Sequence, residues 1–160
     1  TPKQQLDSFE LHLQAAVALQ LPLFLHERDA QDEFLELVSH YRCGFNKAVV
    51  HCFTGTQAFL VKLIELDLHI GITGWICDER RGEHLRSAVK LIPNDRLMLE
   101  TDSPYLLPKD MRPKPKSSRN EPAYLPYILQ RVAHYRVQDP QELAQQTEAT
   151  VNDFFEIGQD

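Results

Sequence analysis

Stretches with apolar residues at helical spacing alternate along this chain with short stretches that are almost wholly apolar. Residues 1–20 open with Thr1, Pro2 and Gln4, the pattern of a capped helix start, and apolar residues then recur at helical spacing. Residues 21–26 form an apolar run that ends in a histidine, which is typical of a strand buried on both faces. We therefore predict a helix over residues 1–20 and a strand directly after it.

The same alternation continues as far as residue 102. Asp29 and Thr56 are suited to cap two helices, and a further helix is predicted over residues 79–91. This alternation predicts parallel strands that are joined by helices through right-handed crossovers. The further strands are predicted over residues 47–53, 68–74 and 96–102.

A proline-rich segment, residues 103–122, interrupts this pattern. It is longer than a simple connection between elements, so we interpret it as a functional lid or binding loop. Beyond it, apolar spacing predicts a helix over residues 123–136 and another that Asp139 caps. A last, short helix is predicted around Val151 and Phe154.

Four parallel strands with helices fit either an open doubly wound sheet or half of an eight-stranded barrel, and the polar residues at the strand ends help to separate the two. His26, His51 and Asp102 lie at the carboxyl ends of three different predicted strands. In barrels, catalytic side chains from several strands converge on that face. Imidazole and carboxylate together suit Zn²⁺, Mn²⁺ or a similar divalent ion. One such histidine alone is more often structural, but three equivalent positions favour a metal site.

Composition limits the classes of function. The chain has 160 residues, of which 42% are hydrophobic and 25% charged, which suits one globular domain. No run approaches the roughly 18 apolar residues of a membrane helix, and the polar start lacks the apolar core of a signal peptide. We therefore expect a cytoplasmic protein with no membrane partner. The net charge of −6 argues against a protein that coats nucleic acid, although the basic segment Lys109–Arg119 suffices to hold a phosphate.

Several common catalytic motifs do not occur in the sequence. Cys43, Cys52 and Cys77 lack C-x-x-C spacing, so neither a disulfide framework nor a thiolate zinc site is predicted. There is no G-x-S-x-G elbow, Walker A loop or G-x-G-x-x-G segment. Hydrolysis by metal-activated water is therefore the chemistry that the strand-end residues suit best.

Five segments resemble the signature segments of the TatD family of metal-dependent DNases, in that family's order and spacing. The combination of HCFTG with ETDSPYL is far more specific than any single short motif. The segments are HERDA (26–30), VVHCFTGT (49–56), IGITGWICDERRG (70–82), LETDSPYLLP (99–108) and RNEPAYLP (119–126).

This resemblance implies a TIM barrel that binds two divalent ions, Mg²⁺ or Mn²⁺ with Zn²⁺ as an alternative, and hydrolyses phosphodiester bonds in DNA as a 3′–5′ exonuclease, with RNA as a second substrate. By resemblance, His26 and His51 hold one metal ion, while Asp102 ligates the other and orients or deprotonates the attacking water. The substrate side is expected to include Arg28, Tyr105, Arg119, Asn120 and Glu121. Two of these residues have a purely structural alternative to a substrate role. Arg28 can instead form an ion pair with Asp29 or Glu27, and Glu121 can serve as a charge at a helix start.

The sequence also departs from the family pattern. The H-x-H pair of the first strand and the G-E-x-G-L-D segment, which supplies a metal-bridging glutamate, do not occur. We therefore expect a single domain over residues 1–160 that supplies strands five to eight of the barrel, with the N-terminal half absent. Two other functions stay open: an amidohydrolase-like metallo-hydrolase of a small ester, lactone or amide, and an inactive or partner-binding half barrel. The oligomeric state is not predicted.

Overall fold

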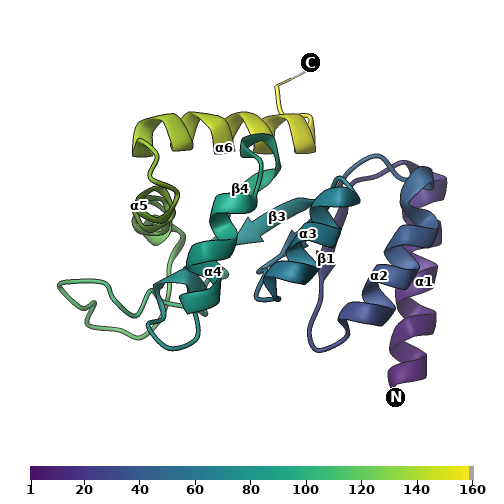
Figure 1. Ribbon diagram of the computed structural model, residues 1–160, viewed down its shortest axis with the longest axis horizontal. Coiled ribbons are helices and arrows are strands. Elements are labelled where there is room, and N and C mark those ends of the chain that lie inside the picture. The colour runs from purple at the N-terminus through teal and green to yellow at the C-terminus, as the bar shows by residue number, and fades with distance from the viewer. Residues whose placement is uncertain (159–160) are drawn as a thin grey trace.

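The computed structural model describes residues 1–158, so the last two residues of the predicted domain lie outside the described part. It contains one sheet whose strands pair in parallel in the order β1-β2-β3-β4, the order in which they occur along the chain (Figure 1). The strands are β1 (Leu23–His26), β2 (Ala48–His51), β3 (His69–Ile72) and β4 (Leu97–Leu99).

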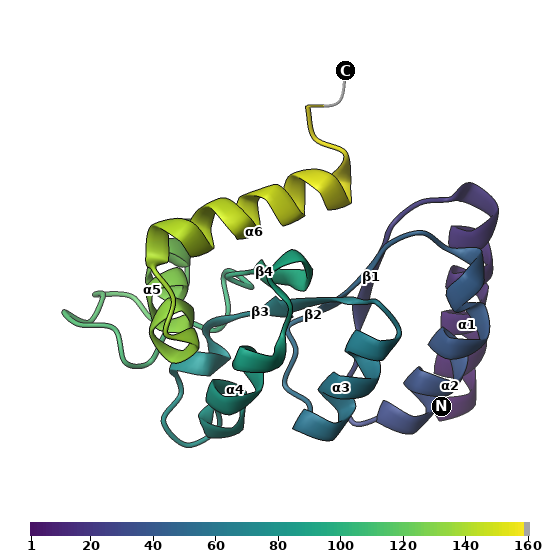
Figure 2. The same cartoon turned by 45° about the horizontal axis from the view of Figure 1, so that its top comes forward.

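This strand order separates the two predicted architectures. A doubly wound sheet reverses its strand order and carries helices on both faces, whereas a barrel adds each strand beside the previous one with its helix outside. Here the order never reverses, and the helices that follow β1, β2 and β3 lie on one side of the sheet (Figure 2). The predicted half barrel is therefore confirmed. The helices are α1 (Pro2–Leu19), α2 (Gln31–Tyr41), α3 (Gln57–Glu65), α4 (Glu83–Ala88), α5 (Leu125–Arg136) and α6 (Pro140–Phe155).

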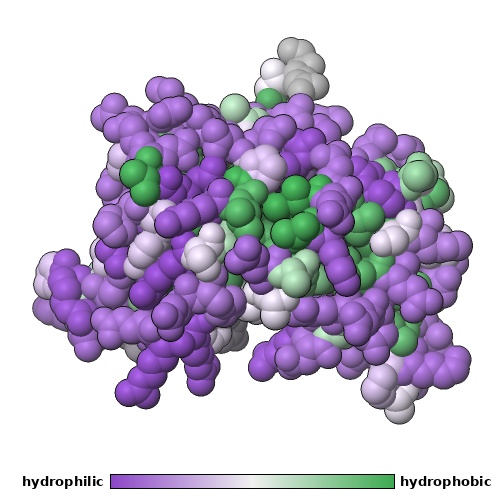
Figure 3. Space-filling view, viewed as in Figure 1, coloured by the Kyte–Doolittle hydropathy of each residue, from purple (hydrophilic) through white to green (hydrophobic). Residues whose placement is uncertain are grey.

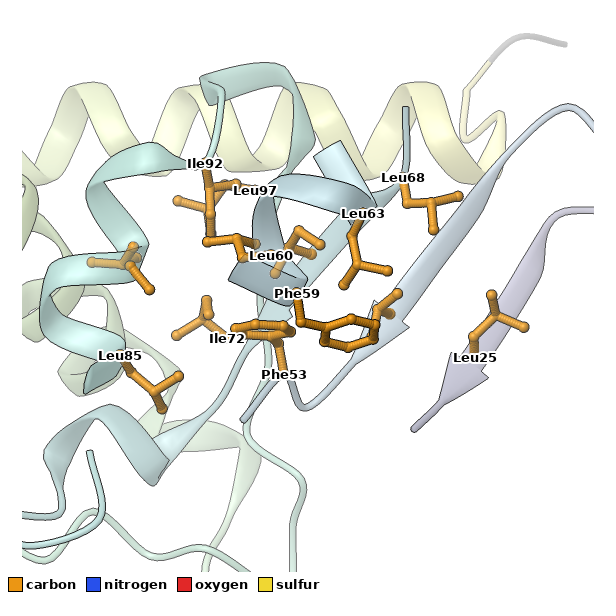
Figure 4. Packing of buried hydrophobic residues seen from close by; sticks show 14 of the residues in the cluster. Leu25, Phe53, Phe59, Leu60, Leu63, Leu68, Ile72, Leu85, Ile92 and Leu97 are labelled. Atoms are coloured by element: carbon orange, nitrogen blue, oxygen red, sulfur yellow. The ribbon is translucent and has the colours of Figure 1, made fainter. Parts of the chain in front are cut away.

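The main core lies between the outer face of the sheet and the helices that cover this face. Alternate residues of each strand point toward the helices, so Leu25 and Ile72 belong to the same buried cluster as Leu60 of α3 and Leu85 of α4 (Figure 4). Removing such side chains from water stabilises the fold by about 1.5–3 kcal/mol each. The outer face of the half barrel therefore has a complete core of its own.

The inner face of the sheet is covered only at the amino ends of its strands. There α6 brings Phe154 into a small cluster with Val49 and Met98, and the ring of Phe154 lies 4.9 Å from that of His69. Phe24, on the same inner face, stays 58% exposed. Thus α6 closes one end of the inner face and leaves the carboxyl ends of the strands open.

Three local predictions were wrong. The helix predicted from residue 79 begins only at Glu83, because residues 78–82 form a turn around Asp78. Asp29 does not cap α2; instead Oε1 of Glu27 accepts the N–H of Ala30 at 2.7 Å. Residues 140–155 form one continuous helix rather than two, because no glycine or proline interrupts them after Pro140.

The predicted caps of the other helices are confirmed. Thr1 and Gln4 form a capping box, Thr56 accepts the N–H of Phe59, and Asp139 accepts two N–H groups at the start of α6. These caps fix where three helices begin, and Thr56 in particular sets the direction in which the chain leaves β2.

The surface seen from the side of Figure 1 is mostly hydrophilic, with one apolar patch around the position of α3 (Figure 3). Val61 of this helix is 41% exposed. Within residues 1–158, none of the helices is both long and apolar enough to cross a membrane.

Candidate active site at the carboxyl ends of the strands

The open end of the sheet holds a cavity of about 510 Å³, which we call the strand-end cavity. This volume lies within the range of ligand-binding pockets, and polar side chains from several elements converge on it. Its lining comprises His26, Glu27, Arg28, Asp29, Gln31, Cys52, Thr54, Gly55, Trp75, Arg81, His84, Asp102 and Leu106.

His51 is held at the edge of this cavity by Glu100. Oε2 of Glu100 lies 2.7 Å from Nδ1 of His51 and also accepts the backbone N–H of Cys52 at 3.0 Å. Burial raises the pKa of the Glu100 carboxyl above its ordinary value, and the His51 imidazole opposes this shift. With Nδ1–H as the donor to the Glu100 carboxylate, the lone pair of the His51 imidazole is on Nε2.

The space for the Glu100 side chain exists because residue 71 is glycine. Gly71 lies on β3 between the strands of His51 and Glu100, and a Cβ atom there would be 2.2 Å from Oε1 of Glu100. Such a distance is far below van der Waals contact. Gly71 therefore allows the carboxylate to lie flat against the inner face of the sheet.

The second nitrogen of His51 faces the carboxylate of Asp102. The distance from Nε2 to Oδ1 is 3.4 Å, and both side chains are partly buried. Asp102 and Cys52 have left-handed backbone conformations, with φ of 56° and 50°, at points where the chain leaves β4 and β2. Such conformations are uncommon for residues other than glycine and cluster at functional sites.

The atoms of this pair suit a cation. The Nε2 lone pair and an ionised carboxylate are both acceptors, so they repel each other unless a positive charge lies between them. Two atoms that would ligate one divalent ion, each about 2.1 Å from it, stand about 3.0 Å apart in octahedral and about 3.4 Å apart in tetrahedral coordination. Nε2 of His51 and Oδ1 of Asp102, 3.4 Å apart, are therefore close enough to hold one divalent metal ion together.

His26 and Cys52 flank the pair differently. The rings of His26 and His51 lie 5.7 Å apart on paired strands, so the predicted ligand His26 is beside the pair without joining it.

Sγ of Cys52 lies within 4.8 Å of ligand atoms of both His51 and Asp102. Burial raises the pKa of this thiol to about 11, and Asp102 and Glu100 act in the same direction. The thiol is therefore protonated and a weak ligand beside the imidazole and the carboxylate.

The predicted substrate residues lie in three places. Arg28 lines the strand-end cavity and makes an exposed ion pair of 3.8 Å with Asp29, as the structural alternative had it. Tyr105 is 71% exposed beside the cavity residue Leu106. Arg119 and Glu121 line a separate cavity with Ser103 and Pro104. The structure therefore does not bring all five into one cavity.

Asn120 has a distinct environment within this set. It is 1% exposed, and its Nδ2 donates to the carbonyl oxygens of Thr101 at 2.7 Å and Tyr105 at 2.6 Å. Its Oδ1 accepts the N–H of Glu121. The side chain of Asn120 therefore holds the turn that follows Asp102 rather than facing the cavity.

Sequence reasoning missed four residues of this region. Glu100 was not named as a candidate, although it is the first of three polar residues that directly follow β4. Trp75, Arg81 and His84 also line the cavity, and none of the three was predicted as a site residue. Their signal was their position in the segment after β3, which must lie at the same end of the sheet as the other strand ends.

Known proteins resemble this chain over nearly its whole length. Residues 1–156 match the family described as TatD related DNase. The protein named 3′-5′ ssDNA/RNA exonuclease TatD is 53% identical in Citrobacter rodentium and 48% identical in Escherichia coli K12, each over 157 residues. Each match covers 98% of this chain and 60% of the relative. The chain therefore spans about 60% of the length of these curated relatives.

Solved structures agree in fold. An uncharacterised amidohydrolase from Saccharomyces cerevisiae matches with a TM-score of 0.83 and 24% identity, covering 96% of this chain and 60% of that one. A TatD homologue from Escherichia coli K12 matches with a TM-score of 0.79 and 23% identity, covering 91% and 54%. At these identities the likeness concerns the fold, and it supports the half barrel described above. The match over residues 1–156 establishes that the chain belongs to the TatD related DNase family.

Proposed function

We propose that the protein containing this chain is a divalent-metal-dependent hydrolase that removes nucleotides from the 3′ end of single-stranded DNA, with RNA as a second substrate. The observation that carries the proposal is the pair of facing acceptors, Nε2 of His51 and Oδ1 of Asp102, 3.4 Å apart at an open cavity. The names of the relatives at about 50% identity supply the substrate class.

His26, His51 and Asp102 are the proposed ligands of the metal ions, Mg²⁺ or Mn²⁺ with Zn²⁺ as an alternative. A bound divalent ion lowers the pKa of a water molecule and stabilises charge on a phosphoryl oxygen. Asp102 presents one carboxylate oxygen to His51, so its other oxygen is free to orient the attacking water and to accept its proton. Glu100 keeps Nε2 of His51 directed at the ligand position.

The substrate enters from the open face of the cavity. Arg28, with a side chain 83% exposed, and Tyr105 are placed to meet a phosphate and a base or sugar. Arg119 and Glu121 lie farther along the loop that carries Tyr105, residues 103–122, and Asn120 holds this loop in place. In this proposal Asn120 positions the loop from inside, and the exposed residues on either side of it contact the strand.

The chain holds part of the proposed site. It spans about 60% of the length of its relatives, and it lacks the H-x-H and G-E-x-G-L-D segments that the family resemblance implies for further ligands. We therefore assign the activity to the full-length gene product, and we expect the 160-residue chain alone to bind metal weakly.

The proposal is tested by incubating the full-length product with single-stranded DNA labelled at its 5′ end, in the presence of Mg²⁺ or Mn²⁺. We expect a ladder of products shortened from the 3′ end that is abolished by EDTA and by Asp102→Asn. Asp7→Asn, an exposed carboxylate on α1, is the matched control and should leave the ladder unchanged. If DNA stays intact while p-nitrophenyl acetate is hydrolysed, the metallo-hydrolase of small esters replaces this proposal. If neither is cleaved and no metal is retained, the non-catalytic half barrel does.

A further inference from the structure

The wall of the strand-end cavity that follows β3 carries an arginine with an unusual environment. The guanidinium carbon of Arg81 lies 5.5 Å from the centre of the Trp75 ring, and both residues line the cavity. This is the geometry of a cation–π interaction. Neither residue takes part in the proposed metal chemistry.

The guanidinium of Arg81 has no other partner. Among residues 1–158 its side chain makes no hydrogen bond and no ion pair, in contrast to the other arginine of this cavity, Arg28, which pairs with Asp29. Nearby, Arg86 donates to two carbonyl oxygens and Arg131 pairs with Asp110. Arg81 is therefore the arginine of the strand-end cavity whose donors are all available to a ligand.

The turn that carries Arg81 is held by hydrogen bonds to the side chain of Asp78. Asp78, 4% exposed, accepts the backbone N–H of Arg81 at 3.0 Å and the Nζ of Lys109 at 2.5 Å. Gly82 follows, and a Cβ atom there would lie 2.3 Å from the carbonyl oxygen of Trp75. The turn can approach Trp75 this closely only because residue 82 is glycine. The stacked position of Arg81 is thus built into the fold.

A guanidinium over an indole ring keeps the donors at its edge free while the ring limits its freedom to move. Such an arginine is well suited to hold a phosphate through two parallel hydrogen bonds. The indole adds an apolar surface against which a base or sugar can stack. Arg81 and Trp75 share the cavity with Asp102, so a ligand held there lies next to the proposed point of hydrolysis.

We infer that Arg81 and Trp75 form a subsite for single-stranded nucleic acid, in which Arg81 binds the phosphodiester next to the one that is cleaved and Trp75 supports the attached nucleotide. This inference rests on the proposed function and adds the residues that hold the strand during cleavage. The subsite accepts any base, because the contacts are to the phosphate and to an aromatic face.

The test measures binding of a fluorescent ten-nucleotide phosphorothioate DNA, which resists hydrolysis and keeps its negative charges, to the full-length product in Mg²⁺. Arg81→Ala should weaken binding about tenfold, the loss expected for a charge-assisted phosphate contact. A plot of the logarithm of the association constant against the logarithm of the salt concentration should also have a slope that is smaller by about 0.7. This is the value for the loss of one phosphate contact on a single strand. Arg80→Ala removes the same charge from the neighbouring residue, which lies outside this cavity, and should change binding less than about twofold.

Two further measurements separate this inference from the proposed function. Arg81→Ala should lower the hydrolysis of bis(p-nitrophenyl) phosphate less than it lowers the binding of the DNA, because that small diester has no neighbouring phosphate to bind, and Arg80→Ala should leave this hydrolysis unchanged. If the wild-type protein binds the phosphorothioate DNA through Arg81 but cleaves no unmodified single-stranded DNA, the subsite stands and the exonuclease proposal fails. If Arg81→Ala and Arg80→Ala weaken binding equally, the subsite is overturned whatever the activity. Trp75→Phe, which keeps an aromatic ring, should retain more affinity than Trp75→Ala, and equal affinities of the two would also contradict it.

Discussion

The carboxylate of Glu100 fixes the imidazole of His51 through a hydrogen bond of 2.7 Å between Nδ1 and Oε2. The bond joins residues from β2 and from the end of β4, across the intervening strand β3. It selects the tautomer in which Nε2 carries the lone pair, and this nitrogen faces Asp102 at 3.4 Å. The orientation of the proposed ligand atom Nε2 is therefore set by Glu100, which contacts the other nitrogen of the imidazole.

Replacing Glu100 should weaken metal binding without removing a ligand. We expect Glu100→Gln in the full-length product to lower Mn²⁺ affinity by about tenfold, because an amide no longer polarises the imidazole, and this is the usual loss for such an outer partner. Titration calorimetry with Mn²⁺ measures the change. Glu65→Gln, at the exposed end of α3, is the matched control. Equal affinities of the two variants would show that Glu100 does not support His51.

Gly71 and Glu100 should depend on each other. Gly71→Ala places a methyl group 2.2 Å from the present position of Oε1 of Glu100, so we expect a loss of about 1–3 kcal/mol in the free energy of unfolding together with weaker Mn²⁺ binding. In a Glu100→Ala background the clash is gone, and adding Gly71→Ala should then have little further effect. Urea unfolding of the four proteins measures the coupling. Additive losses would contradict the proposed steric contact.

Two neighbouring phenylalanines offer a test of how α6 closes the sheet. Phe154 is 1% exposed and packs on the inner face, whereas Phe155 is 46% exposed. Phe154→Ala should lower the free energy of unfolding by about 3–5 kcal/mol, the usual loss for a buried phenylalanine. Phe155→Ala should lower it by less than about 1 kcal/mol. If Phe154→Ala does not fold, Phe154→Leu replaces it. Its loss in the free energy of unfolding should be smaller than that of Phe154→Ala, but still larger than the loss caused by Phe155→Ala.

Asp78 should make stability depend on pH in the acid range. Its hydrogen bonds to Lys109 and to the N–H groups of Arg81 and Arg80 lower the pKa of its carboxyl well below the ordinary value. A lowered pKa in the folded state means that this stabilisation is complete above the ordinary aspartate pKa and is lost as the pH falls below it. Asp78→Asn should therefore destabilise the protein at pH 7, and its difference from wild type should shrink between about pH 4 and pH 2. Urea unfolding at pH 7, 4 and 3 measures this difference, and a constant one would contradict the assigned pKa.

Much of the fold could be predicted from the sequence because its signals are local. Apolar runs such as residues 47–53 can only be buried strands between amphipathic helices, and Thr56 and Asp139 mark helix starts by their own side chains. The choice between a barrel and a doubly wound sheet needed the order of the strands, which alternation alone does not determine. The turn at residues 78–82 was missed because Lys109, far along the chain, helps to hold Asp78.

The strand-end residues of the candidate site could be predicted from the sequence, but the contacts that orient them could not. His26, His51 and Asp102 are recognisable because parallel strands place their carboxyl ends together. The role of Glu100 depends on the register of β2 against β3 and of β3 against β4, and on the missing side chain at Gly71. The stacking of Arg81 on Trp75 depends on the shape of a turn. Neither of these relationships leaves a pattern in the sequence.

The proposed metal-dependent exonuclease activity is tested most directly by the metal dependence of cleavage in one set of proteins. Full-length wild type, Asp102→Asn and Asp7→Asn would be stripped with EDTA and then titrated with Mn²⁺ while the release of 3′-terminal nucleotides from single-stranded DNA is followed. We predict that Mn²⁺ restores the rate of wild type and Asp7→Asn equally, and that Asp102→Asn stays inactive at every concentration. Cleavage that survives complete removal of metal, or that Asp102→Asn retains at the wild-type rate, would contradict the assignment of this site.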